Sequence, residues 1–153
     1  MDINGKNFVK FTERQKVFEE QNNKENAGKQ HNKGKLTARE RIDILFDSGT
    51  FEEIDAFATP LIKETGFGKI KSSYGDGVII GHGRISNRLA FAFAQDFSIM
   101  GGSLGAVHAA KISKIQDMAL KMGAPLIGVI DSGGARIQEG VASLAGYASI
   151  FYR

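Results

Sequence analysis

The sequence contains no cysteine and only three histidines in 153 residues. Without cysteine, neither a disulfide framework nor a thiolate metal site can form. The histidines, His31, His82 and His108, are too scattered along the chain to suggest a zinc cluster. We therefore predict no metal site in this chain.

Long apolar runs are also absent, because no stretch approaches the roughly 18 apolar residues of a membrane-spanning helix. The first residues, from Met1 to Lys6, lack the apolar core of a signal peptide. A cytoplasmic location is the default expectation. The length suits one compact domain and is too short for two large ones.

The net charge of +3 is concentrated near the N-terminus. Residues 1–41 hold 10 Lys and Arg against 6 Asp and Glu, whereas residues 42–153 hold 10 against 11. A basic segment without a binding motif or interleaved aromatics favours a solvated helix face over a nucleic-acid site. A third possibility is that the same charges bind a phosphate-rich ligand. We expect no nucleic-acid partner.

The chain divides into a polar leader, residues 1–35, and a domain-forming part, residues 36–153. In the leader, residues 1–20 are predicted to form an amphipathic helix and residues 21–35 a polar linker or loop. In the domain part, Thr37 and Glu40 fit a capping box that opens a helix, whose apolar side would dock on a neighbouring surface and which Gly49 would end.

The rest of the domain part alternates between strand and helix patterns. The expected elements are a short strand at 51–57, an irregular loop at 60–75, a hairpin at 76–94 with its turn at 86–88, a helix at 104–122 and a strand at 125–130. The second hairpin strand is apolar throughout, so it should be buried on both faces. This order predicts an α/β fold with βαβ crossovers and a partly parallel sheet.

A run of small residues, Ser132-Gly-Gly-Ala135, connects the last strand pattern to a second helical pattern. Such a connection leaves backbone N–H groups free and aimed at one spot, where a helix dipole favours negative charge. Glycine and alanine also let the backbone approach a ligand closely. The run predicts an anion or oxyanion site, with a plain strand-to-helix turn as the alternative. The glycine-rich turns at 101–105 and 131–136 should share the edge where strands end and ligands bind.

Two familiar motifs are rejected. The turn at 101–105 cannot be a dinucleotide fingerprint, because Met100 stands where a glycine is needed. Asp131-Ser-Gly-Gly134 also occurs around the serine of trypsin-like proteases, but a helix after the serine and the absence of cysteine argue against that class. We interpret Ser132 as a turn or cap residue and expect Asp131 to hold the loop by accepting hydrogen bonds from backbone amides.

Three further side chains are ambiguous from sequence. His108 fits a packing role better than that of a general base. Lys111 lies within an apolar stripe, so it should extend outwards or meet an acidic partner. The guanidinium of Arg136 would suit a carboxylate or phosphate, with an ion pair to Glu139 as the alternative.

The stretch 131–140 resembles the signature of the carboxyltransferase (beta) subunits of biotin-dependent acyl-CoA carboxylases of the propionyl-CoA carboxylase type, and of the related biotin-dependent acyl-CoA decarboxylases. Further blocks of this family match in the family's order, namely 34–43, 75–78, 97–105, 121–125, 145–147 and 150–153. The resemblance implies a crotonase-like (ClpP/crotonase) βαβ fold. The chain would be an N-terminal fragment that holds an incomplete half-domain, preceded by a helical segment.

The resemblance also implies an activity, the movement of a carboxyl group between carboxybiotin and the α-carbon of a short acyl-CoA of the propionyl-CoA or methylmalonyl-CoA type. The acyl thioester would form an enolate held by backbone N–H donors. The family motif places the catalytic donors at Gly134 and Ala135. The residues implied in substrate binding are Gly101, Gly102, Ser103, Gly133 and Arg136.

The implied cofactor is biotin on a partner carrier protein or domain, with acyl-CoA as substrate. The implied partners are the biotin carboxyl carrier and biotin carboxylase subunits and further copies of the full-length chain. One alternative is the carboxyltransferase subunit of a sodium-pumping acyl-CoA decarboxylase, which would meet a membrane only through partner subunits. Another is a non-catalytic assembly module. We expect the chain to be inactive alone, because the family's second donor turn would follow its last residue.

Overall fold

The computed structural model describes residues 3–21, 24–61, 64–66, 68–70 and 73–153. The helices are α1 (Ile3–Gln21), α2 (Lys24–His31), α3 (Ala38–Leu45), α4 (Ala106–Met122) and α5 (Val141–Tyr152). The strands are β1 (Glu52–Ile54), β2 (Glu64–Thr65), β3 (Gly68–Lys69), β4 (Val78–Ile85), β5 (Arg88–Gln95) and β6 (Leu126–Val129). Three short 3₁₀ turns are η1 (Tyr74–Gly77), η2 (Met100–Gly102) and η3 (Ile137–Glu139).

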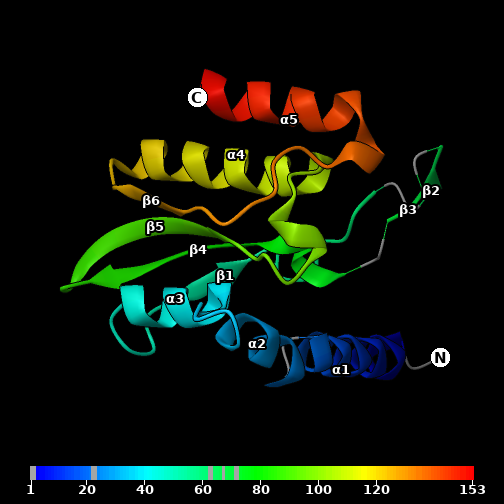
Figure 1. The fold of residues 1–153 in the computed structure, drawn as a ribbon. Helices are drawn as coiled ribbons and strands as arrows, with labels where there is room; N and C mark the ends of the chain where they lie inside the picture. The colour runs from blue at the N-terminus through cyan, green and yellow to red at the C-terminus, as the bar shows by residue number, and fades with distance from the viewer. Residues whose placement is uncertain (1–2, 22–23, 62–63, 67, 71–72) are drawn as a thin grey trace.

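The central sheet has the strand order β1-β4-β5-β6 (Figure 1). β4 and β5 form the antiparallel hairpin that the sequence predicts, and β1 pairs antiparallel with β4. β6 returns through α4 to lie parallel to β5, with Phe91 opposite Leu126 and Ala94 opposite Val129. The mixed α/β fold with a partly parallel sheet is therefore confirmed.

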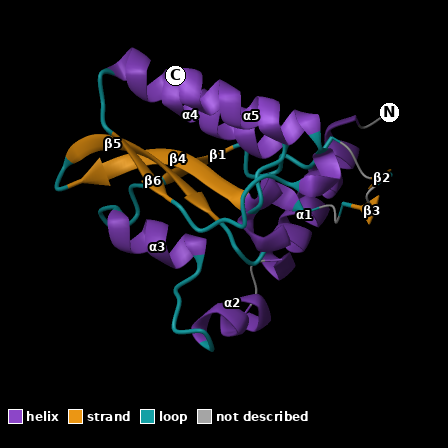
Figure 2. Ribbon diagram, turned by 45° about the horizontal axis from the view of Figure 1, so that its top comes forward, coloured by secondary structure: helices purple, strands orange, loops and turns teal. Residues whose placement is uncertain are grey.

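Helices cover both faces of the sheet. α4 packs on one face with α5 on its outer side, and α3 lies against the other face (Figures 1 and 2). β5 serves both layers, since Phe91 packs with the core beneath α4 while Ala90 and Ala92 pack with Ile42 of α3. Burial of this strand on both faces follows the prediction from its unbroken apolar sequence.

The predicted capping box at the start of α3 is present. Thr37 Oγ1 accepts from the Glu40 amide at 3.2 Å, and the Glu40 carboxylate accepts from the Thr37 amide at 2.8 Å. The helix docks as expected, with Ile42 and Phe46 buried against the sheet. Its end was predicted wrongly, because the chain becomes extended at Phe46 instead of continuing to Gly49.

Two other predictions for the N-terminal half need correction. The segment 21–35 is not simply a loop, since α2 occupies Lys24–His31. The predicted irregular loop at 60–75 contains the β2–β3 pair and the start of η1, while residues 62–63, 67 and 71–72 lie outside the described residues. The predicted N-terminal helix is present as α1, where Phe11 and Phe18 contact the ring of Phe57.

None of the helices in the described part of the chain is both long and apolar enough to span a membrane.

Candidate functional site

The two glycine-rich turns lie side by side beyond the carboxyl ends of β5 and β6. The Gly133 amide donates to the carbonyl of Gly101 at 2.8 Å. The Leu104 amide donates to Gly134 O, and the Arg136 amide donates to Leu104 O, each at 2.9 Å. The two turns are thus joined as a short parallel bridge, between Leu104 and Ala135. The shared edge predicted from the βαβ order is confirmed.

The small-residue turn offers one open donor. The amides of Gly133 and Arg136 are used by the neighbouring turn, and the Gly134 amide donates to Ser132 Oγ at 3.1 Å. The Ala135 amide has no hydrogen-bond partner among the described residues. In a parallel bridge the two flanking residues pair with the opposite residue, so the N–H of the central residue points away from the bridge. Ala135 is that central residue.

The turn does not lead directly into a helix. The 3₁₀ turn η3 follows Arg136, and α5 begins only at Val141. The expectation that the small-residue run leads directly into an α-helix is therefore wrong. Because the field of a helix dipole falls off within its first turn, the polarity at Ala135 comes from the local backbone rather than from α5.

The partner turn has an unusual backbone. Met100, Gly101 and Gly102 all have positive φ, at 49°, 65° and 62°. A non-glycine residue in this region is strained, and such strain clusters at functional sites. A Cβ atom at Gly102 would overlap the carbonyl oxygen of Asp131, so the close approach of the two turns requires glycine there.

Ser132 joins the two turns to each other, and Asp131 joins them to the end of the leader and to α3. Ser132 Oγ donates to Gly102 O at 2.6 Å, which confirms it as a turn residue. The prediction that Asp131 accepts from backbone amides is wrong. Its carboxylate instead accepts from Lys35 Nζ at 3.0 Å and Arg41 Nη2 at 3.1 Å. Partial burial raises the pKa of the carboxyl, but the hydrogen bonds and charges of the two cations outweigh this and leave the pKa lowered.

Arg136 is buried, with 1% of its surface exposed. Its Nη1 lies 2.6 Å from Asp76 Oδ1 and 2.8 Å from Glu139 Oε1, and its Nη2 donates to Ser103 O at 2.9 Å. The ion pair with Glu139 is the alternative that the sequence left open. A guanidinium enclosed in this way presents no surface to a substrate. This geometry therefore gives Arg136 no direct contact with a substrate.

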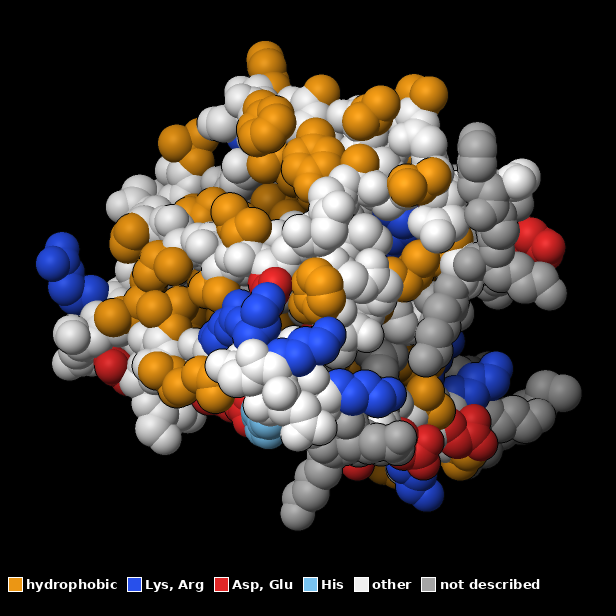
Figure 3. Space-filling view, in the orientation of Figure 1, with side chains coloured by type: hydrophobic (Ala, Val, Ile, Leu, Met, Phe, Trp, Pro, Cys, Tyr) orange, Lys and Arg blue, Asp and Glu red, His pale blue; other side chains and the backbone are white. Residues whose placement is uncertain are grey.

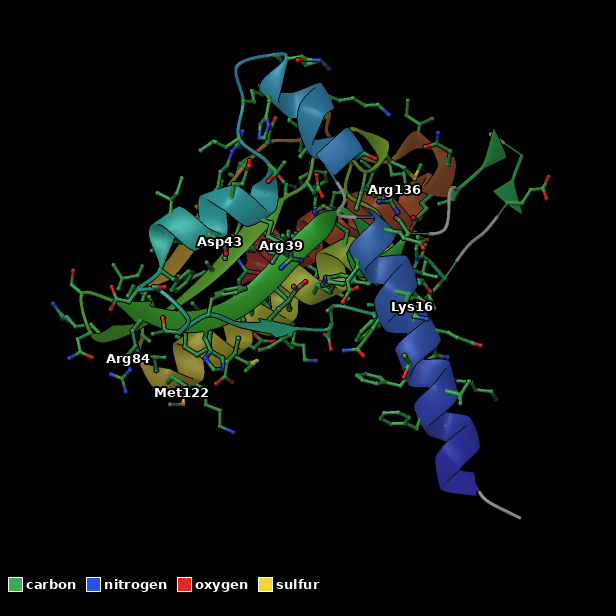
Figure 4. The ribbon with its side chains drawn as sticks, turned by 90° about the horizontal axis from the view of Figure 1, so that it is seen from below. Lys16, Arg39, Asp43, Arg84, Met122 and Arg136 are labelled. Atoms are coloured by element: carbon green, nitrogen blue, oxygen red, sulfur yellow. The ribbon has the colours of Figure 1, made fainter. Side chains whose placement is uncertain are left out.

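The two carboxylates around Arg136 also cap α4. Glu139 Oε2 accepts from the Ala106 amide at 2.7 Å, and Asp76 Oδ2 accepts from the His108 amide at 2.9 Å. The N-cap of this helix, Gly105, has no side chain to supply these acceptors. The buried cluster therefore fixes the small-residue turn, the start of α4 and the Gly-Asp-Gly turn relative to one another. In Figure 4 Arg136 lies at the opposite end of the sheet from Arg84 and Met122.

Comparisons with known proteins show which family the chain belongs to. The family model for the carboxyl transferase domain matches residues 29–153. The chain belongs to the carboxyl transferase domain family. It is 56% identical over 124 residues to the propionyl-CoA carboxylase beta chain of Cereibacter sphaeroides, covering 81% of this chain and 24% of that protein. It is 55% identical over 125 residues to the methylmalonyl-CoA decarboxylase subunit alpha of Veillonella parvula, with 81% and 24% covered.

The fold is similar to that of transcarboxylase 12S, whose crystal structure holds methylmalonyl-coenzyme A and methylmalonic acid. The TM-score is 0.85 at 40% identity, over 98% of this chain and 29% of that one. The chain thus spans about a quarter of the length of the curated relatives. The carboxyltransferase resemblance and the crotonase-like fold class expected from the sequence are both confirmed, for part of a domain.

The buried side chain of His108 contacts the ion-pair cluster through Asp76. His108 is fully buried, its Nδ1–H donates to Asp76 O at 3.0 Å, and its Nε2 accepts from Gln95 Nε2 at 3.2 Å. Burial, reinforced by the charges of Arg136 and Lys111, lowers the pKa of His108 to about 3. The imidazole is therefore neutral near pH 7, which agrees with the packing role preferred from sequence.

Both predictions for Lys111 are wrong, because the residue is 2% exposed and no carboxylate among the described residues contacts its ammonium. Its Nζ donates instead to the carbonyls of Gly75 and Val78. Burial lowers the pKa of Lys111 to about 8, although the charges of nearby carboxylates oppose the shift.

Sequence reasoning assigned no role to Asp76, which holds Arg136, caps α4 and contacts His108. The available signal was an acidic residue between two glycines directly before a buried strand. Within the described residues, no group of three or more His, Cys, Asp or Glu is placed to hold a metal ion.

Proposed function

We propose that this chain forms the part of an acyl-CoA carboxyltransferase that holds the acyl thioester while its α-carbon gains or loses a carboxyl group. In this proposal residues 36–153 belong to the N-terminal carboxyltransferase domain and residues 1–35 lead into it. The observation that carries the proposal is the open amide of Ala135, in a turn of small residues at the carboxyl ends of β5 and β6. The names of the relatives support a short acyl-CoA substrate.

The chemistry explains why a backbone donor matters. Removal of a proton from the α-carbon of a thioester places negative charge on the thioester oxygen. A fixed N–H aimed at that oxygen stabilises the enolate without having to reorganise during the reaction. Carboxybiotin on a carrier would supply the carboxyl group. Within this chain, Ala135 would be the first donor, while the neighbouring Gly134 amide donates to Ser132 Oγ.

The surrounding residues have supporting roles in this proposal. Gly101, Gly102, Ser103 and Gly133 would line the acyl-CoA pocket with their backbone, where the absence of large side chains leaves room. Arg136 would act as a positioning residue, because it contacts Ser103 O and both carboxylates but no exposed surface. A donor held by a buried ion-pair cluster keeps its direction when the substrate binds.

The partners belong to the proposal as well. A biotin carboxyl carrier and a biotin carboxylase would supply the activated carboxyl group, and further copies of the complete subunit would assemble with this one. The hexamer assembly of transcarboxylase 12S supports the latter. The cytoplasmic location expected from the sequence is part of the same proposal. The decarboxylase alternative is not favoured, since the Veillonella decarboxylase subunit is no closer, at 55%, than the carboxylase beta chain at 56%.

The decisive experiment removes the donor and leaves the side chain nearly unchanged. In the complete subunit, Ala135→Pro eliminates the amide hydrogen, whereas Ala135→Gly retains it. No internal hydrogen bond is lost in the proline variant, because the Ala135 amide has no partner in the described structure. We expect kcat to fall about 100- to 1,000-fold in Ala135→Pro and only a few-fold in Ala135→Gly. Unchanged turnover in a folded Ala135→Pro subunit would reject the proposal.

A further inference from the structure

A basic patch lies beside the small-residue turn. We call it the Phe97 patch and define it as Lys33, Lys35, Arg41 and Phe97. Lys33 Nζ lies 5.7 Å and Lys35 Nζ lies 5.2 Å from the centroid of the Phe97 ring, which is cation–π distance. The space-filling view shows Lys and Arg side chains gathered around an apolar ring on this face (Figure 3).

The positive charge of the patch is only partly neutralised. Asp131 is the one carboxylate that contacts it among the described residues, through Lys35 and Arg41. Lys33 has no ion-pair partner in the described part of the chain. The side chain of Lys35 remains 45% exposed and that of Arg41 23% exposed, while Asp131 is 13% exposed. The cations thus face solvent, and the anion that orders them is mostly covered.

The patch is physically continuous with the candidate site. Asp131, which Lys35 and Arg41 hold, immediately precedes Ser132 of the small-residue turn. On the other side, the ring of Phe97 lies 4.0 Å from where a Cβ would stand on Gly101, and Gly101 O accepts from the Gly133 amide. The patch therefore adjoins the turn that holds Ala135, and a ligand bound at Ala135 can extend onto the surface that carries these cations.

We propose that the Phe97 patch binds the phosphates of the nucleotide half of acyl-CoA, an inference that rests on the proposed function above. Coenzyme A joins its thioester through a long flexible arm to a diphosphate and a 3′-phosphate, so its charged end must lie on the surface near the site. Lysine ammonium groups bind phosphate as point charges, and arginine binds it through paired donors. The contact of Lys33 and Lys35 with the Phe97 ring limits their rotamers, which reduces the entropy lost when a phosphate binds.

Lys33 is the residue to test, because it is exposed and lacks an ion pair within the described chain, so its change disturbs no internal contact with a carboxylate. In the complete subunit, Lys33→Glu is compared with Lys121→Glu. Lys121 is exposed on α4, on the opposite face of the sheet, and its substitution gives the same change in net charge. Carboxyl transfer is measured with an acyl-CoA and with the matching acyl-pantetheine thioester, which lacks the nucleotide.

We expect Lys33→Glu to raise the KM for acyl-CoA about five- to tenfold at low salt with little change in kcat, and Lys121→Glu to leave both unchanged. With acyl-pantetheine the wild type and Lys33→Glu should have the same KM, because the phosphates are absent. Equal KM values for acyl-CoA would overturn the proposal, as would a KM increase that persists with acyl-pantetheine. A change confined to melting temperature or assembly would also overturn it and would mean that an acidic segment covers the patch.

Failure of this proposal is distinguishable from failure of the proposed function. If the wild-type subunit transfers carboxyl groups but Lys33→Glu behaves like wild type, only the phosphate site is wrong. If no acyl thioester is a substrate of the wild type, the proposed function itself is wrong.

Discussion

Arg136 Nη1 lies 2.6 Å from Asp76 Oδ1, although 60 residues separate them in the sequence. Neither side chain has exposed surface. The pair gains a second carboxylate from Glu139, so one guanidinium balances two buried anions that also cap α4. Charges this deep remain charged only because each has partners.

Replacement of Arg136 by alanine should therefore be strongly destabilising. The substitution leaves Asp76 and Glu139 close together without a cation, and breaking a buried pair in this way costs about 3–5 kcal/mol. The free energy of unfolding of the complete subunit, from urea titration, measures the effect. Arg84→Ala is the control, because Arg84 is exposed at the hairpin turn and should cost less than about 1 kcal/mol. Equal costs for the two variants would contradict the account of the cluster.

The buried imidazole of His108 predicts a specific dependence of stability on pH. Its folded pKa is lowered to about 3 from 6.5, so below pH 6.5 the unfolded chain binds a proton that the folded chain does not. The contribution is complete above pH 6.5 and is lost as pH falls from 6.5 towards 3. The slope is about 1.4 kcal/mol per pH unit.

Unfolding measurements at pH 7, 6 and 5 check this prediction. His108→Gln should show a flatter pH dependence than the wild type. Parallel pH profiles for wild type and His108→Gln would mean that the imidazole is not held neutral in the folded chain.

Local patterns were the features that the sequence predicted well. The Thr37 and Glu40 capping box depends on residues within one turn of helix, and the unbroken apolar run of β5 reports burial on both faces directly. The approach of the turns at Gly101 and Gly133 follows from chain order, because a βαβ unit brings the carboxyl ends of its parallel strands to one edge.

Long-range polar contacts could not be predicted from these patterns. Nothing in the sequence near Asp131 points to Lys35, which lies 96 residues away, and nothing near Arg136 points to Asp76. α2 was missed because its sequence is almost entirely polar and shows no apolar face. Gly49 was misread as a helix end, although its positive φ serves a later turn and α3 ends where Phe46 packs on Phe51.

The docking of α3 should contribute substantially to stability. Phe46 is 5% exposed, and its ring centroid lies 4.9 Å from that of Phe51. Phe46→Ala should cost about 3–5 kcal/mol, because it removes a large buried side chain and leaves a cavity. Ile44→Ala on the same helix is the control, since Ile44 is 72% exposed. A melting temperature unchanged by Phe46→Ala would show that α3 is loosely attached.

The conformation of Gly134 should matter for turnover more than for stability. Its φ is 99°, and a Cβ added there would meet nothing within 4 Å. Valine at this position would strain the backbone and redirect the amides of the small-residue turn, so kcat should fall about 100-fold in the complete subunit. Gly49→Val is the control. Gly49 also has a positive φ, 72°, and open space around it, so valine imposes a similar backbone strain there. Gly49 follows α3 and is far from the two turns in the sequence. Equal turnover in the two variants would count against a catalytic role for the Gly134 turn.

The 153-residue chain on its own should be inactive and prone to associate. α5 has no charged residue before Arg153, and several of its large side chains are well exposed, namely Val141 at 80%, Leu144 at 62%, Phe151 at 81% and Tyr152 at 90%. β6 is an edge strand of the described sheet, with one side unpaired. Exposed apolar surface of this kind favours self-association.

A single open donor at Ala135 also provides only part of an oxyanion site, since such sites usually combine several donors. Size-exclusion chromatography of the purified chain, together with an assay of carboxyl transfer from carboxybiotin to propionyl-CoA, tests both expectations. A stable monomer with saturable transfer would mean that the complete catalytic machinery lies within these residues and that the Ala135 turn is not its centre.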